Sequence, residues 1–162
     1  TLDYSRRPGG SWGAAELTTL EGYVRRGGLL AAINSGANYV MLRRLDDPNE
    51  DARALNPLFE PLGVHLAYGA TGGDIVRAVA EHPLLEQAGY LTQFPDNGVP
   101  FQMKTGLVLA RSEGIPVIGL VEVGEQGGQI LVIADLGLVQ ANGAARNLNF
   151  IRNLARYARS RP

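Results

Sequence analysis

Residues 17–33 read LTTLEGYVRRGGLLAAI and predict a helix that ends on a glycine pair and is followed at once by a buried strand. The last turn of a helix favours cations, and the residue just beyond it is often a glycine with positive φ. Arg25, Arg26 and Gly27 satisfy both conditions. The apolar run Leu29–Ile33 has no polar alternation, which is typical of a strand covered on both faces. This junction between a helix and a buried strand therefore indicates an α/β domain.

The length and composition of the chain predict one domain that spans residues 1–162. With 162 residues, of which 45% are hydrophobic, the chain can bury one sizeable core but is short for two ordinary domains. Residues 1–13 are polar and rich in glycine, and we interpret them as a loop or as the remnant of an upstream strand.

The charge balance limits the partners that the chain can have. Fifteen basic and sixteen acidic side chains give a net charge of −1, so no overall field draws the protein to nucleic acid or to an anionic membrane surface. No apolar run reaches the ~18 residues of a membrane span and no leader opens the chain, so we expect no membrane insertion of this segment. Another protein or a small polar ligand is the expected partner.

The absence of cysteine limits the chemistry further. A chain with no cysteine has no disulfide, no thiolate nucleophile and no cysteine-ligated metal. Its two histidines, His65 and His82, lack the spacing of convergent metal ligands, so no metal site is expected. The glycine pairs open no G-x-G-x-x-G or Walker pattern, and no cofactor is expected.

The order of predicted elements indicates the architecture. We expect a helix at 14–26, a strand at 29–33, a helix that opens at Asp47, a strand at 64–67, strands at 107–110, 116–123 and 129–134, and a closing helix at 144–159. Residues 75–80 fit a short helix and also an extended segment. This order predicts a three-layer α/β/α sandwich with a mostly parallel central sheet and a C-terminal antiparallel hairpin, one or two strands short at the amino end.

Several segments, in order, resemble a known superfamily. They are Glu16-Leu17, YVRRGGLL at 23–30, LNPLFEPLGV at 55–64, HPL at 82–84, GGQILVIAD at 127–135, and the last helix with Asn147 and Asn149. The set is similar to the class I glutamine amidotransferase-like superfamily. Within it, the set resembles the non-catalytic branch of bacterial domains of unknown function, auxiliary proteins of gliding-type ABC transporters and an intraflagellar-transport subunit. The resemblance implies a flavodoxin-like topology and a bacterial protein of the cytoplasm or the cell envelope.

The resemblance also implies that the catalytic positions are vacant. Active members carry a cysteine on the sharp turn after a central strand, and a histidine with a carboxylate after a later strand. Here the first turn reads Asn34-Ser35-Gly36, and the later strand is followed by Asp135 without a histidine. Glutaminase chemistry is thereby excluded, and no catalytic residue is expected.

Four residues form the candidate ligand-binding site: Asn34, Ser35, Asp135 and Asn142. Asp135 ends an apolar strand, and α/β domains collect ligands at the carboxyl ends of their strands. Asparagine amides suit hydrogen bonding to sugars or peptides, although all four residues are equally ordinary in turns and caps. Ser35 lacks the G-x-S-x-G frame and a neighbouring base.

Two functions from different classes follow from these observations. The first is a non-catalytic ligand-binding or protein-interaction module. The alternative is a hydrolase that uses Ser35 and Asp135, which requires a deep pocket with Asp135 inside it. A binding module instead shows a shallow edge there and apolar surface elsewhere. Homo-oligomerisation through Trp12, Tyr39, Phe94 or Phe101 is a third reading.

Overall fold

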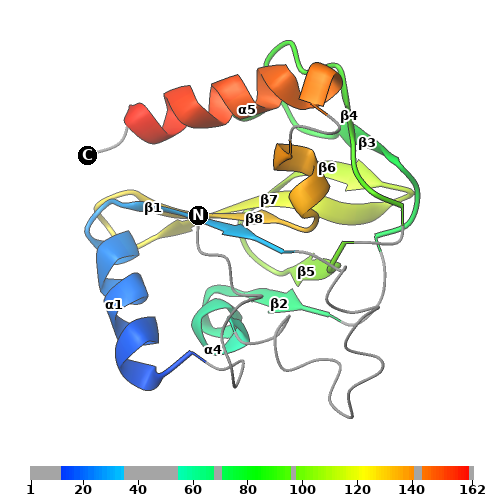
Figure 1. Cartoon of the computed structure of the whole chain (residues 1–162). Helices are drawn as coiled ribbons and strands as arrows, with labels where there is room; N and C mark the ends of the chain where they lie inside the picture. The colour runs from blue at the N-terminus through cyan, green and yellow to red at the C-terminus, as the bar shows by residue number, and fades with distance from the viewer. Residues whose placement is uncertain (1–11, 35–54, 68–70, 96–97, 141–143, 161–162) are drawn as a thin grey trace.

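The computed structural model describes residues 12–34, 55–67, 71–95, 98–140 and 144–160 (Figure 1). Its helices are α1 (Ala14–Arg25), α4 (Asn56–Phe59) and α5 (Ala144–Arg159), with short 3-10 helices η2 (Glu60–Leu62), η3 (Pro83–Leu85) and η4 (Leu136–Val139). Its strands are β1 (Leu29–Ile33), β2 (Val64–Leu66), β3 (Ile75–Ala78), β4 (Tyr90–Thr92), β5 (Phe101–Met103), β6 (Leu107–Ser112), β7 (Ile115–Val123) and β8 (Gly128–Ile133). Within this part of the chain, the eight strands outnumber the three α-helices and the three short 3-10 helices.

The main sheet has six strands in the order β1-β8-β7-β6-β3-β4. Only the β1–β8 pair is parallel, and every other pair within this sheet is antiparallel. Strand β6 carries register shifts between Val108 and Arg111. Bulges of this kind bend a strand and increase its twist. The sheet therefore curls into a half-barrel.

The expected three-layer α/β/α sandwich with a mostly parallel sheet is thus wrong. A parallel pair needs a long crossover between its strands, whereas antiparallel neighbours need only a turn. Short turns join β6 to β7 and β7 to β8, so these three strands run alternately up and down. On one face of the sheet, the small antiparallel pair β2–β5 lies with α1 and α4 in the place where a full layer of helices was expected (Figure 1).

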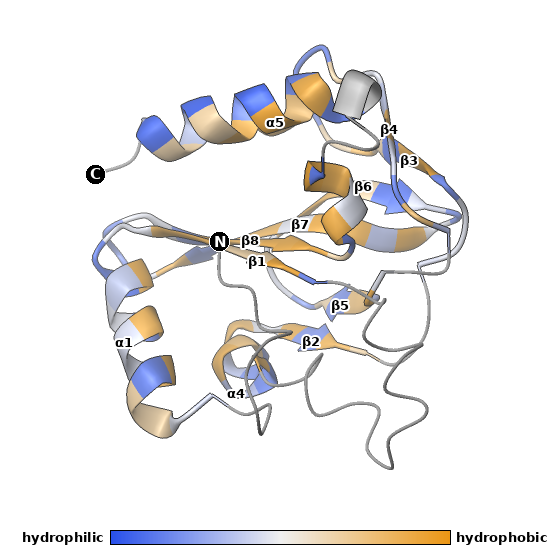
Figure 2. Ribbon diagram, viewed as in Figure 1, coloured by the Kyte–Doolittle hydropathy of each residue, from blue (hydrophilic) through white to orange (hydrophobic). Residues whose placement is uncertain are grey.

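The centre of the core lies on β7 and β8. All six residues of β8 are buried, and Leu131, Val132 and Ile133 are completely inaccessible. Figure 2 shows the hydrophobic colour concentrated on β1, β7 and β8, and hydrophilic colour along the outer side of α5. Helix α5 contacts η3, β4 and η4, and therefore closes the other face of the curled sheet.

Several predicted elements are confirmed. The helix at the start of the described chain ends at Arg25, Gly27 follows with φ of +96°, and the strand at 29–33 forms as expected. The hairpin of β7 and β8 and the closing helix also form. The helix start expected at Asp47 lies outside the described residues.

The structure decides other local features. Of the two alternatives left open for residues 75–80, the extended segment is found at residues 75–78, which form strand β3 because β4 and β6 pair with them from both sides. Pro57 lies in the first turn of α4, where its missing N–H costs nothing. Strands β4 and β5, each of three residues, were not expected.

Two buried asparagines take the place of a neighbouring strand at sheet edges. Asn147 of α5 accepts a hydrogen bond from the Thr92 N–H (2.9 Å), and its Nδ2 donates to the Thr92 carbonyl (2.7 Å). Asn56 makes the same pair of bonds with the backbone of Leu66 in β2, at 2.8 and 3.1 Å. These amides satisfy backbone groups that an edge strand would otherwise leave unpaired.

Replacing Asn147 by alanine is therefore expected to lower the free energy of unfolding by about 2 kcal/mol, because a buried N–H and C=O of β4 lose their partner. The side chain is completely buried and also donates to the Gly137 carbonyl at 3.2 Å. Asn149→Ala is the matched control, since Asn149 is exposed and makes one bond, to the Gln87 carbonyl. Urea denaturation measures both, and an equal loss in the two variants would contradict this role.

Candidate functional site

The structure brings together two of the four predicted site residues. Asn34 follows β1 and Asp135 follows β8, and because these strands are parallel neighbours, both residues lie at the same end of the pair. The Asn34 N–H donates to the Ile133 carbonyl at 2.9 Å, and its Nδ2 approaches the same oxygen at 3.3 Å. Ser35 and Asn142 lie outside the described residues.

The carboxylate of Asp135 serves the fold. Asp135 is completely buried, its Oδ1 accepts the Gly137 N–H at 2.6 Å, and its Oδ2 accepts the Phe94 N–H at 2.9 Å. It therefore joins the end of β8 to the start of η4 and to the segment that follows β4. The Phe94 ring also packs on Gly137, where an added Cβ would lie 2.8 Å from it. A carboxylate held in this way is closed off from substrate.

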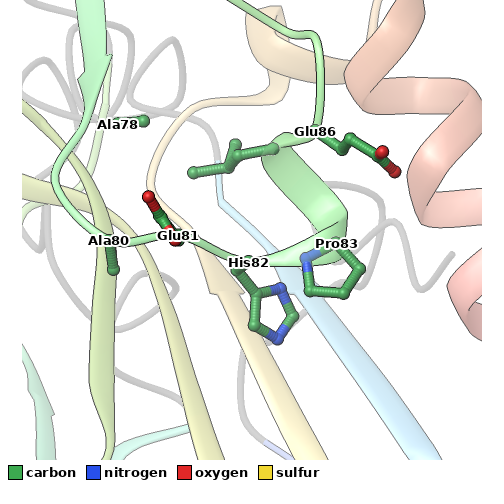
Figure 3. Close-up of a pocket in the computed structure, with 7 residues that line it drawn as sticks. Ala78, Ala80, Glu81, His82, Pro83 and Glu86 are labelled. Atoms are coloured by element: carbon green, nitrogen blue, oxygen red, sulfur yellow. The ribbon is translucent and has the colours of Figure 1, made fainter.

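Two open hollows adjoin elsewhere, at His82, and together we call them the His82 groove. The smaller has a volume of about 590 Å³ and is lined by Ala78, Ala80, Glu81, His82, Pro83, Leu85 and Glu86 (Figure 3). The larger, of about 840 Å³, is lined by His82 and Tyr157, by residues 60–63, 104–107 and 120–122, and by Gln129. Neither hollow is lined by Asn34 or Asp135.

His82 is held in place by its neighbours. Its Nδ1 accepts the Leu84 N–H at 3.2 Å and caps η3, which places the proton of the neutral ring on Nε2. The ring packs edge-on against Tyr157 with centroids 5.3 Å apart. The Tyr157 hydroxyl donates to Gln129 Oε1 at 2.6 Å. A chain of contacts thus connects η3, α5 and β8 at the centre of the groove.

The groove has an apolar floor and a charged rim. Leu107 (44% exposed) and Leu120 lie in its larger part, and Leu85 in the smaller. The rim carries four exposed carboxylates, Glu60, Glu81, Glu86 and Glu122, and one cation, Lys104. Figure 3 shows Glu81 and Glu86 on separate sides of the smaller hollow. This arrangement favours a ligand that carries positive charge together with apolar groups.

The sequence did not reveal the His82 groove. His82 was considered only as a possible metal ligand and lacks the spacing of one, and nothing in the sequence connects it with Tyr157 or Gln129. The one local signal was the His-Pro pair, since proline at the first turn of a short helix favours a capping residue before it. The contact across to α5 depends on the tertiary fold.

The sequence predicted no metal site and no membrane insertion, and the described residues can be searched for both. In the described ranges, no group of three or more His, Asp or Glu side chains is placed to hold a metal ion. The same part of the chain contains no helix with the length and apolar character needed to span a bilayer. Of the aromatic residues considered for self-association, Phe101 is 1% exposed and belongs to the core, whereas Phe94 is 42% exposed. Tyr39 lies outside the described residues.

Comparison with known proteins finds solved structures with a similar fold. No protein-family model matches the chain, and no curated protein matches it. Among solved structures, it is similar to "mmIFT52 N-terminal domain", with a TM-score of 0.68 and 15% identity over 91% of this chain and 72% of that one. At this identity the likeness concerns the fold alone.

Two glycosidases also share part of their structure with the chain. They are a cold-adapted β-galactosidase from Rahnella sp. R3 (TM-score 0.53, 14% identity, 90% of this chain) and the exo-β-1,4-mannosidase Op5Man5 from Opitutaceae bacterium strain TAV5 (TM-score 0.49, 19% identity, 90% of this chain). The chain spans only 21% and 23% of these enzymes, respectively.

The resemblance to the class I glutamine amidotransferase-like superfamily is therefore wrong. These structural neighbours are the IFT52 domain and a β-galactosidase, and the sheet is mixed and strongly curled rather than part of a parallel sandwich. The segments on which the resemblance was based reflect helix ends and apolar strands. These local features occur in mixed β-rich folds as well as in parallel ones. The function proposed below takes no support from that superfamily.

Proposed function

We propose that this chain is a non-catalytic protein-interaction module whose His82 groove binds a partner segment rich in basic and apolar side chains. The observation that carries the proposal is the pairing of an apolar floor with four rim carboxylates against a single lysine. An extended segment with alternating side chains can place apolar groups on such a floor and cations at its rim.

The geometry of Asp135 argues against the hydrolase alternative. A general base must reach the proton that it abstracts, but the carboxylate of Asp135 is fully buried and accepts two backbone N–H groups. The groove itself carries no serine or cysteine among its lining residues. Binding without turnover is the function that this arrangement supports.

The proposal is tested with synthetic peptides in which lysine and leucine alternate. In fluorescence anisotropy, Glu81→Gln combined with Glu122→Gln is expected to weaken binding about tenfold, because each exposed carboxylate contributes ~0.5 to 1 kcal/mol at low salt. Asp74→Asn with Glu125→Gln is the matched control: it removes the same charge from exposed positions outside the groove. Equal weakening by the two pairs would show only a general charge effect and would contradict the proposal.

The apolar floor is tested separately. Leu107→Ser is expected to weaken binding of the same peptides several-fold, because a leucine that is 44% exposed loses the burial it would gain on binding. Its exposure in the free protein keeps the cost to folding small. Glutamate–leucine peptides should not bind, and their binding as tightly as the lysine peptides would exclude the proposed ligand class.

A further inference from the structure

His65 lies beside one of the four carboxylates on the rim of the His82 groove. Its Nδ1 is 2.8 Å from Glu60 Oε1, and the side chains of His65 and Glu60 are 49% and 55% exposed, respectively. Glu60 itself lines the larger part of the groove, together with residues 61–63 and Lys104. A titratable ring therefore contacts one end of the groove from outside its lining.

The local fold holds the two side chains together. Glu60 begins η2, His65 is the middle residue of β2, and Gly63 between them adopts a φ of +78°, which turns the chain. Val64 and Leu66 are buried on either side of His65. Because side chains alternate along a strand, His65 must point away from the core. The contact with Glu60 follows from this short segment alone.

The contact determines which nitrogen takes a second proton. A carboxylate only accepts hydrogen bonds, so Nδ1 carries the proton of the neutral His65 ring and donates it to Glu60. The Nδ2 of Asn56 lies 3.5 Å from the same nitrogen and donates to the Leu66 carbonyl at 3.1 Å. A second proton therefore goes to Nε2, and it places a cation directly beside the Glu60 carboxylate.

Few other charged groups face the ring. Helix α4, η2 and β5 pack against β2. Helix α4 carries no charged residue, and η2 carries only Glu60. From the side of β5, Gln102 lies opposite His65, and Lys104 follows two positions later, where its N–H donates to the Gly63 carbonyl at 2.7 Å. Within these described elements, Glu60 is the one carboxylate that contacts His65.

We infer that protonation of His65 weakens the binding of a basic partner in the His82 groove. The inference rests on the proposed function, because it concerns the same site. While His65 is neutral, Glu60 offers a full negative charge to the partner. Once His65 is an imidazolium, 2.8 Å away, it offsets that charge. Histidine changes its charge between pH 5 and 8, so the groove binds more tightly at neutral than at mildly acidic pH.

Comparison of His65→Gln with the wild type isolates this effect. Glutamine keeps a neutral N–H donor for Glu60 and does not titrate. In fluorescence anisotropy with the lysine–leucine peptides, the two proteins should bind equally at pH 7.5. At pH 5.5, His65→Gln should bind about threefold more tightly, which is the effect of one exposed carboxylate. His82 is present in both proteins, so its own titration cancels in the comparison.

Glu60 is tested separately at pH 7.5. Glu60→Gln should weaken binding about threefold there, whereas Glu125→Gln, at an exposed position outside the groove, should leave it unchanged. Coupling between two sites is reciprocal, so the bound peptide must in turn favour the neutral ring of His65. In nuclear magnetic resonance at pH 6.5, saturating peptide should therefore move the His65 Cε1–H signal toward its neutral position.

The outcomes separate this inference from the proposed function. Peptides that bind at pH 7.5, with equal dissociation constants for the wild type and His65→Gln at pH 5.5, would refute the regulation and leave the proposed function standing. A Glu60→Gln variant that binds as the wild type does would also refute it. If no peptide binds at pH 7.5, both fail. Circular dichroism at each pH verifies that the variants are folded.

Discussion

Replacing Asp135 by alanine is expected to lower the free energy of unfolding by about 3 kcal/mol. The substitution removes the acceptor of two backbone N–H groups, those of Gly137 and Phe94, at a residue with no solvent exposure. Each buried donor left without a partner costs ~1 to 3 kcal/mol. Urea denaturation followed by circular dichroism measures the loss.

Two controls separate this role from catalysis. Asp74→Ala removes an exposed carboxylate from the loop before β3 and is expected to change stability by less than about 0.5 kcal/mol. Asp135→Asn keeps one acceptor oxygen and should fall between alanine and wild type. A catalytic carboxylate behaves in the opposite way, since its removal abolishes turnover while stability stays near that of the wild type.

The elements that the sequence predicts well depend on local signals. The end of α1 combines Arg25 with Gly27, whose positive φ needs no long-range contact to explain it. The turn between β7 and β8 is similar, because Gly124 and Gly127 both adopt positive φ between two apolar runs. A helix end and a hairpin are each determined by residues close together in the chain.

The arrangement of the strands depends on distant residues and was predicted wrongly. The apolar positions Ile75, Val76 and Val79 fit a helix and a strand about equally, and pairing with β4 and β6 decides between them. Strand β1 pairs with β8, a hundred positions along the chain, and nothing near Leu29 specifies that partner. Three-residue strands such as β4 are too short to show a periodic pattern.

At the candidate site too, local features were predicted from the sequence, whereas contacts between distant residues were not. The sequence placed Asp135 at the end of a buried strand, and the structure has it there. Its carboxylate accepts the N–H of Phe94. Phe94 lies in a loop far from Asp135 in the sequence, and only the tertiary fold brings the two residues together. Asn147, which was quoted only as part of the last helix, completes the edge of β4. Residue type predicted hydrogen-bonding capacity, whereas the partner followed from the fold.

Gly128→Ala is expected to destabilise the protein by at least about 3 kcal/mol. Gly128 begins β8 directly beside the last turn of α1, where an added Cβ would overlap the Val24 carbonyl oxygen, lie 2.6 Å from its carbon and 3.2 Å from the Val123 oxygen. These are backbone atoms and cannot rotate away, so α1 must move. Val24 is completely buried, and its carbonyl accepts the Gly27 N–H that ends the helix. Moving α1 therefore costs both core packing and the helix terminus.

Gly22→Ala is the matched control for this prediction, because it adds the same methyl group to α1 itself. There the nearest atom is the flexible end of Arg26, at 3.2 Å, and alanine favours the helix by up to ~1 kcal/mol over glycine. Denaturation should show the two variants moving in opposite directions. Amide hydrogen exchange should accelerate in α1 more than in β7 for Gly128→Ala. If Gly128→Ala is as stable as wild type, the close contact between α1 and β8 is not what fixes the helix to the sheet.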